Sequence, residues 1–74
     1  MADHEIKVTP VDGGWSVECW LVGQPQMFLS DRRAEESAQR LAQTVAAVGE
    51  DARVVVHDRS HALVGTRRYF ANDR

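Results

Sequence analysis

The sequence predicts an α+β domain with the element order ββαββ, a four-stranded, largely antiparallel sheet with one helix packed on one face. Segments near both ends of the chain alternate apolar and polar side chains at a period of two, which is typical of half-buried strands. A middle segment instead repeats apolar side chains every three or four residues, which is typical of a helix. The 74 residues suffice for one domain, 1–74, and we expect its ordered core to span about 5–70.

The first two strands are predicted over 5–11 and 15–22. The sequence Asp12-Gly13-Gly14 between them suits a tight hairpin turn, because glycine accepts a positive φ without a Cβ clash. Alternation separates the side chains of the second strand onto two faces, with Trp15, Val17, Cys19 and Leu21 on one and Ser16, Glu18, Trp20 and Val22 on the other. We expect the face that carries Trp15 to pack against the helix.

The helix is predicted from about Asp31 to Val48, after a loop and the short apolar stretch 27–29. Ser30 or Asp31 can cap its first turn, and Gly49 is placed to end it. One face carries the apolar residues of the segment, namely Ala34, Ala38, Leu41, Ala42 and Val45. This apolar stripe predicts the face of the helix that packs on the sheet.

The last two strands are predicted over 52–57 and 62–70, followed by a frayed end over 71–74. Val54-Val55-Val56 is β-branched throughout, which favours a strand, and 58–61 is predicted to form a turn. The sequence leaves open which face of the last strand turns to the helix, since two pairs of side chains disagree: Leu63 with Tyr69, and Val64 with Phe70.

Three motifs in sequence give residues 8–69 a resemblance to a family of small, mostly bacterial proteins described as domain of unknown function 2188. The motifs are the hairpin Asp12-Gly13-Gly14-Trp15-Ser16-Val17, the helix start Ser30-Asp31-Arg32-Arg33-Ala34 followed by Ala38, Leu41 and Ala42, and the strand Val54-Val55-Val56-His57 with the hairpin to Leu63 and Tyr69. His61 stands where that family usually has a turn glycine, and the 22–27 segment is longer and more apolar than expected. The resemblance implies a fold and supplies no activity, cofactor or catalytic residue.

Composition excludes several classes of protein. Nine basic against eleven acidic residues give a net charge of −2, which excludes an obviously basic nucleic-acid binder and an acidic tail protein. A single cysteine excludes an internal disulfide. No apolar run approaches the roughly 18–20 residues of a membrane-spanning helix, and the polar N-terminus is unlike a signal peptide. We therefore expect a bacterial-type cytoplasmic domain with no membrane partner.

The sequence shows no constellation typical of an enzyme. Cys19 lies among the apolar residues of a predicted strand, where a thiol is buried and unreactive, and no base is placed to activate it. His57, Asp58 and His61 surround a turn and could supply part of a zinc site, but no further cysteine or histidine supports it, so we interpret them as a solvated turn. We expect a non-enzymatic protein with no cofactor, no metal and no small-molecule ligand.

The uncovered face of the sheet is the predicted interaction surface. Four strands span roughly 15–19 Å, whereas one helix covers about 10 Å, so one face stays open and would expose an apolar patch of Trp20, Val22 and Val55. We expect self-association, as a homodimer, or contact with another protein, through this face or an edge strand. An alternative is an unpaired face on which Trp20 packs against the stems of Lys7 and Arg53. The candidate residues are Lys7, Trp20, Val22, Arg53, Val55, His57 and Arg67.

The alternative function is nucleic-acid binding, because the charge is distributed unevenly. Residues 1–52 carry four basic and nine acidic groups, whereas 53–74 carry five basic and two acidic groups. Trp20 on the open face could add base stacking to the phosphate contacts of this basic segment. An isoelectric point near 5.8 argues against a dedicated binder. The basic C-terminal hairpin contains Arg59, His61, Arg67 and Arg68.

Overall fold

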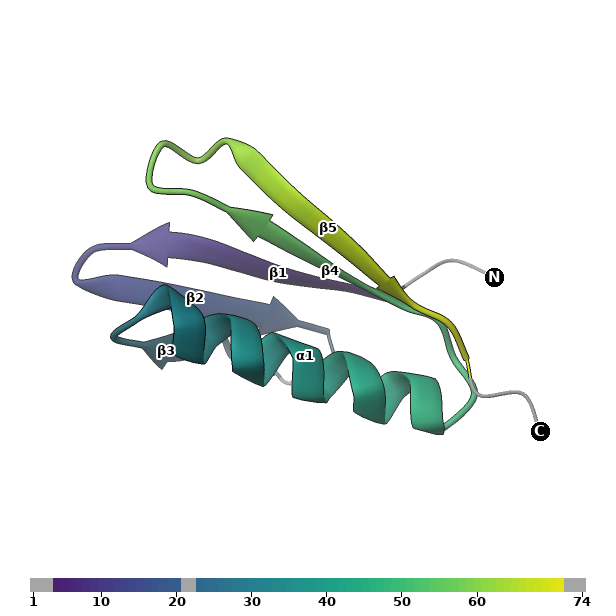
Figure 1. Ribbon diagram of the computed structural model, residues 1–74. Coiled ribbons are helices and arrows are strands. Elements are labelled where there is room, and N and C mark those ends of the chain that lie inside the picture. The colour runs from purple at the N-terminus through teal and green to yellow at the C-terminus, as the bar shows by residue number, and fades with distance from the viewer. Residues whose placement is uncertain (1–3, 21–22, 72–74) are drawn as a thin grey trace.

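The computed structural model describes residues 4–20 and 23–71, and it places one helix against one face of a five-stranded sheet (Figure 1). The fold class is α+β, as predicted, with five strands instead of four. Apart from Ala71, the C-terminal end predicted to fray lies outside the described residues. The elements are β1 (His4–Val11), β2 (Gly14–Cys19), β3 (Gln26–Phe28), α1 (Asp31–Ala47), β4 (Ala52–His57) and β5 (Leu63–Tyr69).

The strand that the sequence pattern does not predict is β3. It pairs with β2 in an antiparallel register that joins Trp15 to Phe28 and Val17 to Gln26. A segment of three residues is too short to show a period of two, so the pattern does not distinguish it from the apolar approach to a helix.

The sheet has the order β3-β2-β1-β4-β5, which places β1 and β4 side by side at its centre. These two strands run parallel, whereas the other neighbouring strands are antiparallel. Parallel neighbours need a long crossover connection, and the segment through β2, β3 and α1 supplies it. The sheet is therefore mixed, with β3 at one outer edge and β5 at the other.

The β1–β2 hairpin turns at Asp12 and Gly13, as predicted. Val11 pairs with Gly14, which leaves a two-residue loop in which Gly13 has a φ of +80°. Gly14 has a separate role, because a Cβ at this position would overlap the backbone carbonyl oxygen of Phe28. The missing side chain allows β3 to approach β2.

Helix α1 begins and packs as the sequence predicts. The Ser30 hydroxyl accepts a hydrogen bond from the Arg33 backbone N–H at 3.2 Å, so Ser30 is the N-cap. The predicted apolar stripe faces the sheet, and Leu41 packs on the core from a half-buried position. The stripe residues that are buried are Ala34, Ala38, Ala42 and Val45.

The core lies between α1 and the inner face of β1, β2 and β4. Trp15, Val17 and Val54 belong to it, which confirms their predicted face. In the last strand, the register shift beside His57 separates Leu63 from Tyr69, because Leu63 pairs with His57 of the open face and Tyr69 pairs with Ala52 of the core. Tyr69 turns to the helix side and packs against the core, whereas Phe70 follows the last residue of the strand and is exposed.

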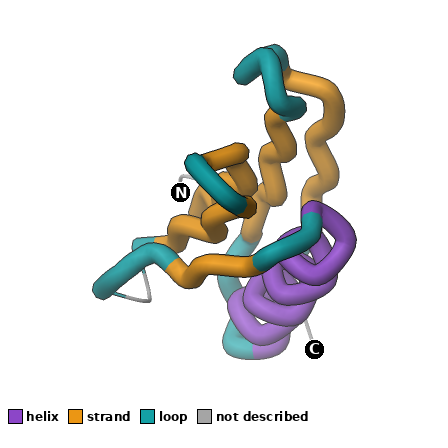
Figure 2. Tube along the Cα trace, turned by 90° about the vertical axis from the view of Figure 1, so that its left-hand side faces the viewer, coloured by secondary structure: helices purple, strands orange, loops and turns teal. Residues whose placement is uncertain are grey.

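The helix covers the sheet unevenly, because the sheet is twisted. Figure 2 shows the hairpin of β4 and β5 rising away from α1, so that the turn between these strands is the part of the hairpin farthest from the helix. The helix packs mainly over β1, β2 and β4 and approaches β5 only marginally. Strand β5, at the edge of the sheet, is therefore largely uncovered by α1.

Candidate interaction surface

Strand β5 is a long, exposed edge of the sheet. Within the described residues no strand lies along its outer side, and five of its seven residues are exposed. Leu63 and Val64 are each 59% exposed, and Phe70 is 66% exposed. Such a strand presents unpaired backbone N–H and C=O groups on which another strand can pair. We call the strand Leu63–Tyr69 together with Phe70 the β5 edge.

The opposite edge of the sheet is shorter. Strand β3 has three residues, and Pro25, which has no backbone N–H, comes directly before it. Short edge strands and prolines are among the features by which natural sheets avoid pairing with other chains. The two edges are therefore unequal, and the β5 edge is the longer of the two.

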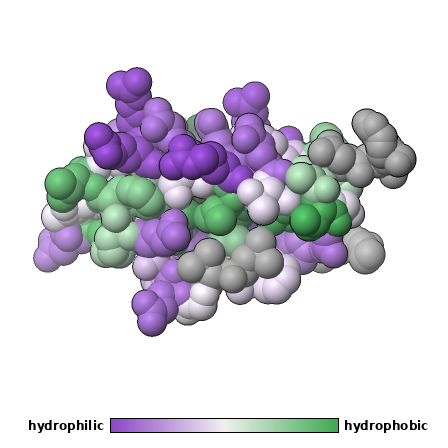
Figure 3. All heavy atoms as spheres, turned by 90° about the horizontal axis from the view of Figure 1, so that it is seen from below, coloured by the Kyte–Doolittle hydropathy of each residue, from purple (hydrophilic) through white to green (hydrophobic). Residues whose placement is uncertain are grey.

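A groove of about 230 Å³ lies between α1 and the β4–β5 hairpin, on the helix side of the sheet. In the view from that side, hydrophobic patches lie along the middle of the molecule beside hydrophilic side chains (Figure 3). A strand added to the β5 edge would direct alternate side chains toward this groove. Its lining residues are Glu35 and Gln39 from α1, Val54 and Val56 from β4, and Gly65, Thr66, Arg67 and Tyr69 from β5.

The turn that leads into β5 is organised by Asp58. Its carboxylate Oδ1 accepts hydrogen bonds from the backbone N–H groups of Ser60 at 2.8 Å and Ala62 at 3.0 Å. Its backbone carbonyl accepts a third hydrogen bond from the N–H of His61 at 2.8 Å. His61 has a φ of +65°, a left-handed conformation that favours glycine. The Asp58 carboxylate thus fixes the geometry of the turn.

Two arginines of the β5 edge lie over aromatic rings. The guanidinium carbon of Arg67 is 5.7 Å from the ring centroid of Tyr69, and that of Arg68 is 5.4 Å from the ring centroid of Phe70. Both are cation–π contacts between residues two apart along the chain. The predicted basic hairpin includes the two arginines but not their aromatic partners, although a spacing of two in a strand places both members of each pair on one face.

The open face of the sheet brings four of the predicted interaction residues together. Lys7 pairs with Val55, and Arg53 and His57 lie on the same side of β4. Val55 is only 7% exposed, however, and is flanked by Lys7 on β1 and Thr66 on β5. The open face is therefore polar where the sequence predicts an apolar patch.

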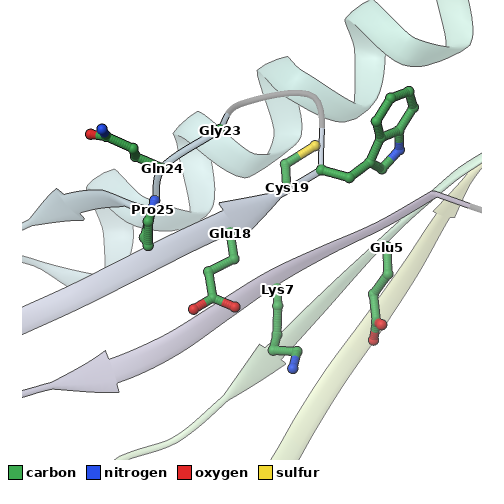
Figure 4. Close-up of a pocket in the computed structure, with 8 residues that line it drawn as sticks. Glu5, Lys7, Glu18, Cys19, Gly23, Gln24 and Pro25 are labelled. Carbon is green, nitrogen blue, oxygen red and sulfur yellow. The ribbon is translucent and has the colours of Figure 1, made fainter.

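A shallow pocket of about 400 Å³ lies at one end of this face, beside the loop over 23–25 (Figure 4). Glu5, Lys7 and Glu18 project to the open side, whereas Cys19 points toward α1. Glu5 Oε2 also lies 3.9 Å from the Arg53 guanidinium. Acidic and basic groups alternate here, so this end of the open face has no uniform charge.

Trp20 does not lie over the open face, contrary to the prediction. Strand β2 ends at Cys19, so the alternation that the prediction extends to Trp20 has already stopped. The indole lies at the end of the sheet, where it lines a small cavity with Val45 of α1 and with Val48, the residue that follows the helix. Its Nε1–H donates a hydrogen bond to His4 Nδ1 at 2.6 Å.

Arg67 and Val22 are the two remaining members of the predicted surface. Arg67 pairs with Val54 and therefore faces the helix side, whereas the prediction groups it with residues of the open face. Val22 lies outside the described residues. Val55 is buried, and Trp20 adds exposed apolar surface only at the end of the sheet, where it borders the pocket of Lys7 and Glu18.

The predicted basic hairpin is divided between locations. The Arg59 guanidinium lies 4.9 Å from the Trp15 ring centroid, and its Nη1 donates to the Val11 carbonyl at 3.3 Å, so Arg59 covers the core. Arg67 faces the helix side, whereas Arg68 pairs with a residue of the open face. The basic residues therefore form no single patch.

Cys19 is a free, buried thiol. Among residues 4–20 and 23–71 no group of three or more histidine, cysteine, aspartate or glutamate side chains is arranged to hold a metal ion. In the same part of the chain no helix has the length and apolar character needed to cross a membrane.

Comparison of the chain with protein-family models, with curated proteins and with solved structures finds no match.

Proposed function

We propose that the protein is a non-enzymatic interaction module that self-associates by pairing its β5 edge antiparallel with the β5 edge of a second copy. The observation that supports this most strongly is the exposure of β5 along its outer side and on both faces, directly beside the largely buried β4. Pairing two such strands around a two-fold axis would continue the sheet from one copy into the other and leave neither edge exposed.

The charges of β5 disfavour two registers for this pairing. A pairing centred on Arg67 or on Arg68 would place like charges directly opposite, which destabilises cross-strand pairs. A pairing centred on Thr66 instead places the two threonines opposite each other and sets Arg67 opposite Gly65 of the second copy. Thr–Thr pairs are among the favourable cross-strand pairs, so we propose the register centred on Thr66.

The same register covers apolar side chains that are exposed in the single chain. Leu63 and Val64 of one copy would lie beside Tyr69 and Arg68 of the other. Because the two-fold axis between antiparallel strands is perpendicular to the sheet, both copies of α1 would lie on the same face. The two grooves beside β5 would then adjoin each other across the axis.

Light scattering at low and high salt tests this proposal. We expect a mass twice the 8.3 kDa of one chain in both conditions, because strand pairing and apolar burial depend little on ionic strength. Thr66→Cys should form a disulfide-linked dimer under mild oxidation, since residues directly opposite have Cβ atoms about 5 Å apart. A mass of 8.3 kDa at the highest soluble concentration would overturn the proposal.

Leu63→Cys is the matched control for the cross-link. Leu63 is exposed on the same strand, but the proposed register places it far from Leu63 of the second copy. The natural Cys19 is buried and should not react. Equal cross-linking at positions 63 and 66 would contradict the proposed register.

A second candidate function is the binding of single-stranded nucleic acid. The stacked pairs Arg67 with Tyr69 and Arg68 with Phe70 favour it, because phosphate contact and base stacking are combined in this way in single-strand binders. Anisotropy of a labelled oligonucleotide would measure it. Affinity should fall steeply with salt and should weaken in Arg67→Gln but not in Arg40→Gln on the helix. No binding at low salt would exclude this candidate.

Two further assignments are proposed from sequence features alone. We propose membership of the family described as domain of unknown function 2188, supported by the order of its three motifs along the chain. We also propose a bacterial cytoplasmic location, supported by the single unpaired cysteine, Cys19.

A further inference from the structure

Three separate segments meet at the side chain of His4. Its Nδ1 accepts the hydrogen bond from Trp20 Nε1 at 2.6 Å, at the end of β2. Its Nε2 is hydrogen-bonded to the carboxylate of Glu50, in the loop between α1 and β4. The imidazole and indole centroids are 4.7 Å apart with an interplanar angle of 47°. His4 therefore holds the end of β2 and the α1–β4 loop to the start of β1.

These two contacts define the protonation state of His4. The indole N–H is only a donor, so His4 Nδ1 must be the acceptor and carries no proton. The single proton of the neutral imidazole then lies on Nε2, where it is donated to Glu50. The hydrogen-bond network thus assigns one tautomer of neutral His4.

We infer that His4 is a protonation-sensitive latch that holds the Trp20 indole while the imidazole is neutral and releases it when the ring gains a second proton. A proton added to His4 goes to Nδ1, which changes that atom from an acceptor into a donor. Two N–H groups then face each other, and the Trp20 hydrogen bond is lost. The contact with Glu50 survives as an ion pair, so the change is confined to Trp20.

The groups around His4 allow this event. Among the described residues, Glu50 is the carboxylate in contact with the imidazole ring. The backbone N–H of His4 donates a separate hydrogen bond to the Asp51 backbone carbonyl at 3.0 Å. The Asp51 carboxylate accepts from the Ala71 N–H at 2.8 Å and is occupied there. On the neighbouring position of β1, Glu5 projects to the open face toward Arg53.

Release of Trp20 would change the surface at this end of the sheet. The indole is already 63% exposed, and it lines both the 400 Å³ pocket with Lys7 and Glu18 and a cavity of about 130 Å³ with Val45 and Val48. A freed indole presents an apolar ring and an unused N–H donor to a binding partner. This surface is separate from the β5 edge, so the latch does not depend on the proposed self-association.

Nuclear magnetic resonance of the two indole N–H groups against pH tests the latch. Trp20→Phe removes one signal and so assigns both. We expect the Trp20 signal to shift upfield together with the titration of the His4 ring, and the Trp15 signal to stay in place. A Trp20 signal that stays fixed while His4 titrates would overturn the inference.

Two variants separate the latch from general acid effects. His4→Gln should abolish the transition of the Trp20 signal, since no proton is taken up at that position. Glu50→Gln removes the charge that favours protonated His4, so the midpoint of the Trp20 transition should move to lower pH. His57→Gln is the matched control and should leave the transition unchanged. A Trp20 transition that persists in His4→Gln would contradict the role of His4.

Discussion

Gly14 lies directly against the backbone carbonyl of Phe28, so β3 approaches β2 across a residue that has no side chain. A Cβ at position 14 would overlap the carbonyl oxygen, and a backbone oxygen cannot move aside without displacing the strand. We predict that Gly14→Ala lowers the free energy of unfolding by about 1–3 kcal/mol, as overpacking does in well-packed structures.

Urea unfolding measures this effect, and Gly65→Ala is its matched control. A Cβ at Gly65 meets nothing within 4 Å, and this glycine is also in a strand. Gly65→Ala should therefore preserve or raise stability by reducing the entropy of the unfolded chain. Equal loss of stability in the two variants would contradict the close approach at Gly14.

His61 should be replaceable by glycine with a gain in stability. Its φ of +65° costs an L-residue about 1–2 kcal/mol, whereas the added freedom of glycine in the unfolded chain costs roughly 0.5–1 kcal/mol. We expect His61→Gly to raise the free energy of unfolding by about 0.5–1 kcal/mol, seen as a higher Tm. Ser60→Gly, without a positive φ to relieve, should lower it. A lower Tm for His61→Gly would show that the imidazole itself stabilises the turn.

The elements that the sequence predicts well are those with many periodic residues. The apolar stripe of α1 and the alternation around Trp15 and Val54 each repeat often enough to define a face. The central parallel pair of β1 and β4 is not predicted, because periodicity identifies strands but does not say which strands are neighbours. Strand order depends on how the crossover packs, which is a property of the whole chain.

The candidate surface is harder to predict, because it depends on where each strand stops. One residue beyond the end of β2 was enough to place Trp20 beside His4 instead of on the open face. Val55 has the predicted face, but its neighbours Lys7 and Thr66 bury it. The exposure of β5 follows from its position at the edge and from the limited reach of α1, neither of which the pattern contains.

Trp15 should be the side chain on which the fold depends most. It is buried in the core between β2 and α1, and Arg59 covers its ring. We predict that Trp15→Ala costs about 3–5 kcal/mol, a large part of the stability of a domain this small. Trp15→Phe keeps a ring in the core and should cost less. Circular dichroism melting curves measure both, and a native-like curve for Trp15→Ala would contradict the assigned face.

Gly65 offers a charge test of the proposed dimer register, since the register sets it opposite Arg67 of the second copy. Gly65→Glu would create an attractive cross-strand pair and Gly65→Lys a repulsive one, each occurring twice by symmetry. With roughly 0.2–1 kcal/mol for each pair, the dissociation constant of the dimer should fall several-fold for glutamate and rise several-fold for lysine.

Both Gly65 variants replace glycine by a longer residue at a site with space for it, so each controls for the steric effect of the other. Analytical ultracentrifugation gives the two dissociation constants, and unfolding of the dilute single chain corrects for changes within one copy. Adding Arg67→Gln should cancel the difference between glutamate and lysine at position 65. If the two variants shift the dissociation constant in the same direction, Arg67 does not face Gly65 across the axis, and a register centred on Thr66 is wrong even where a dimer forms.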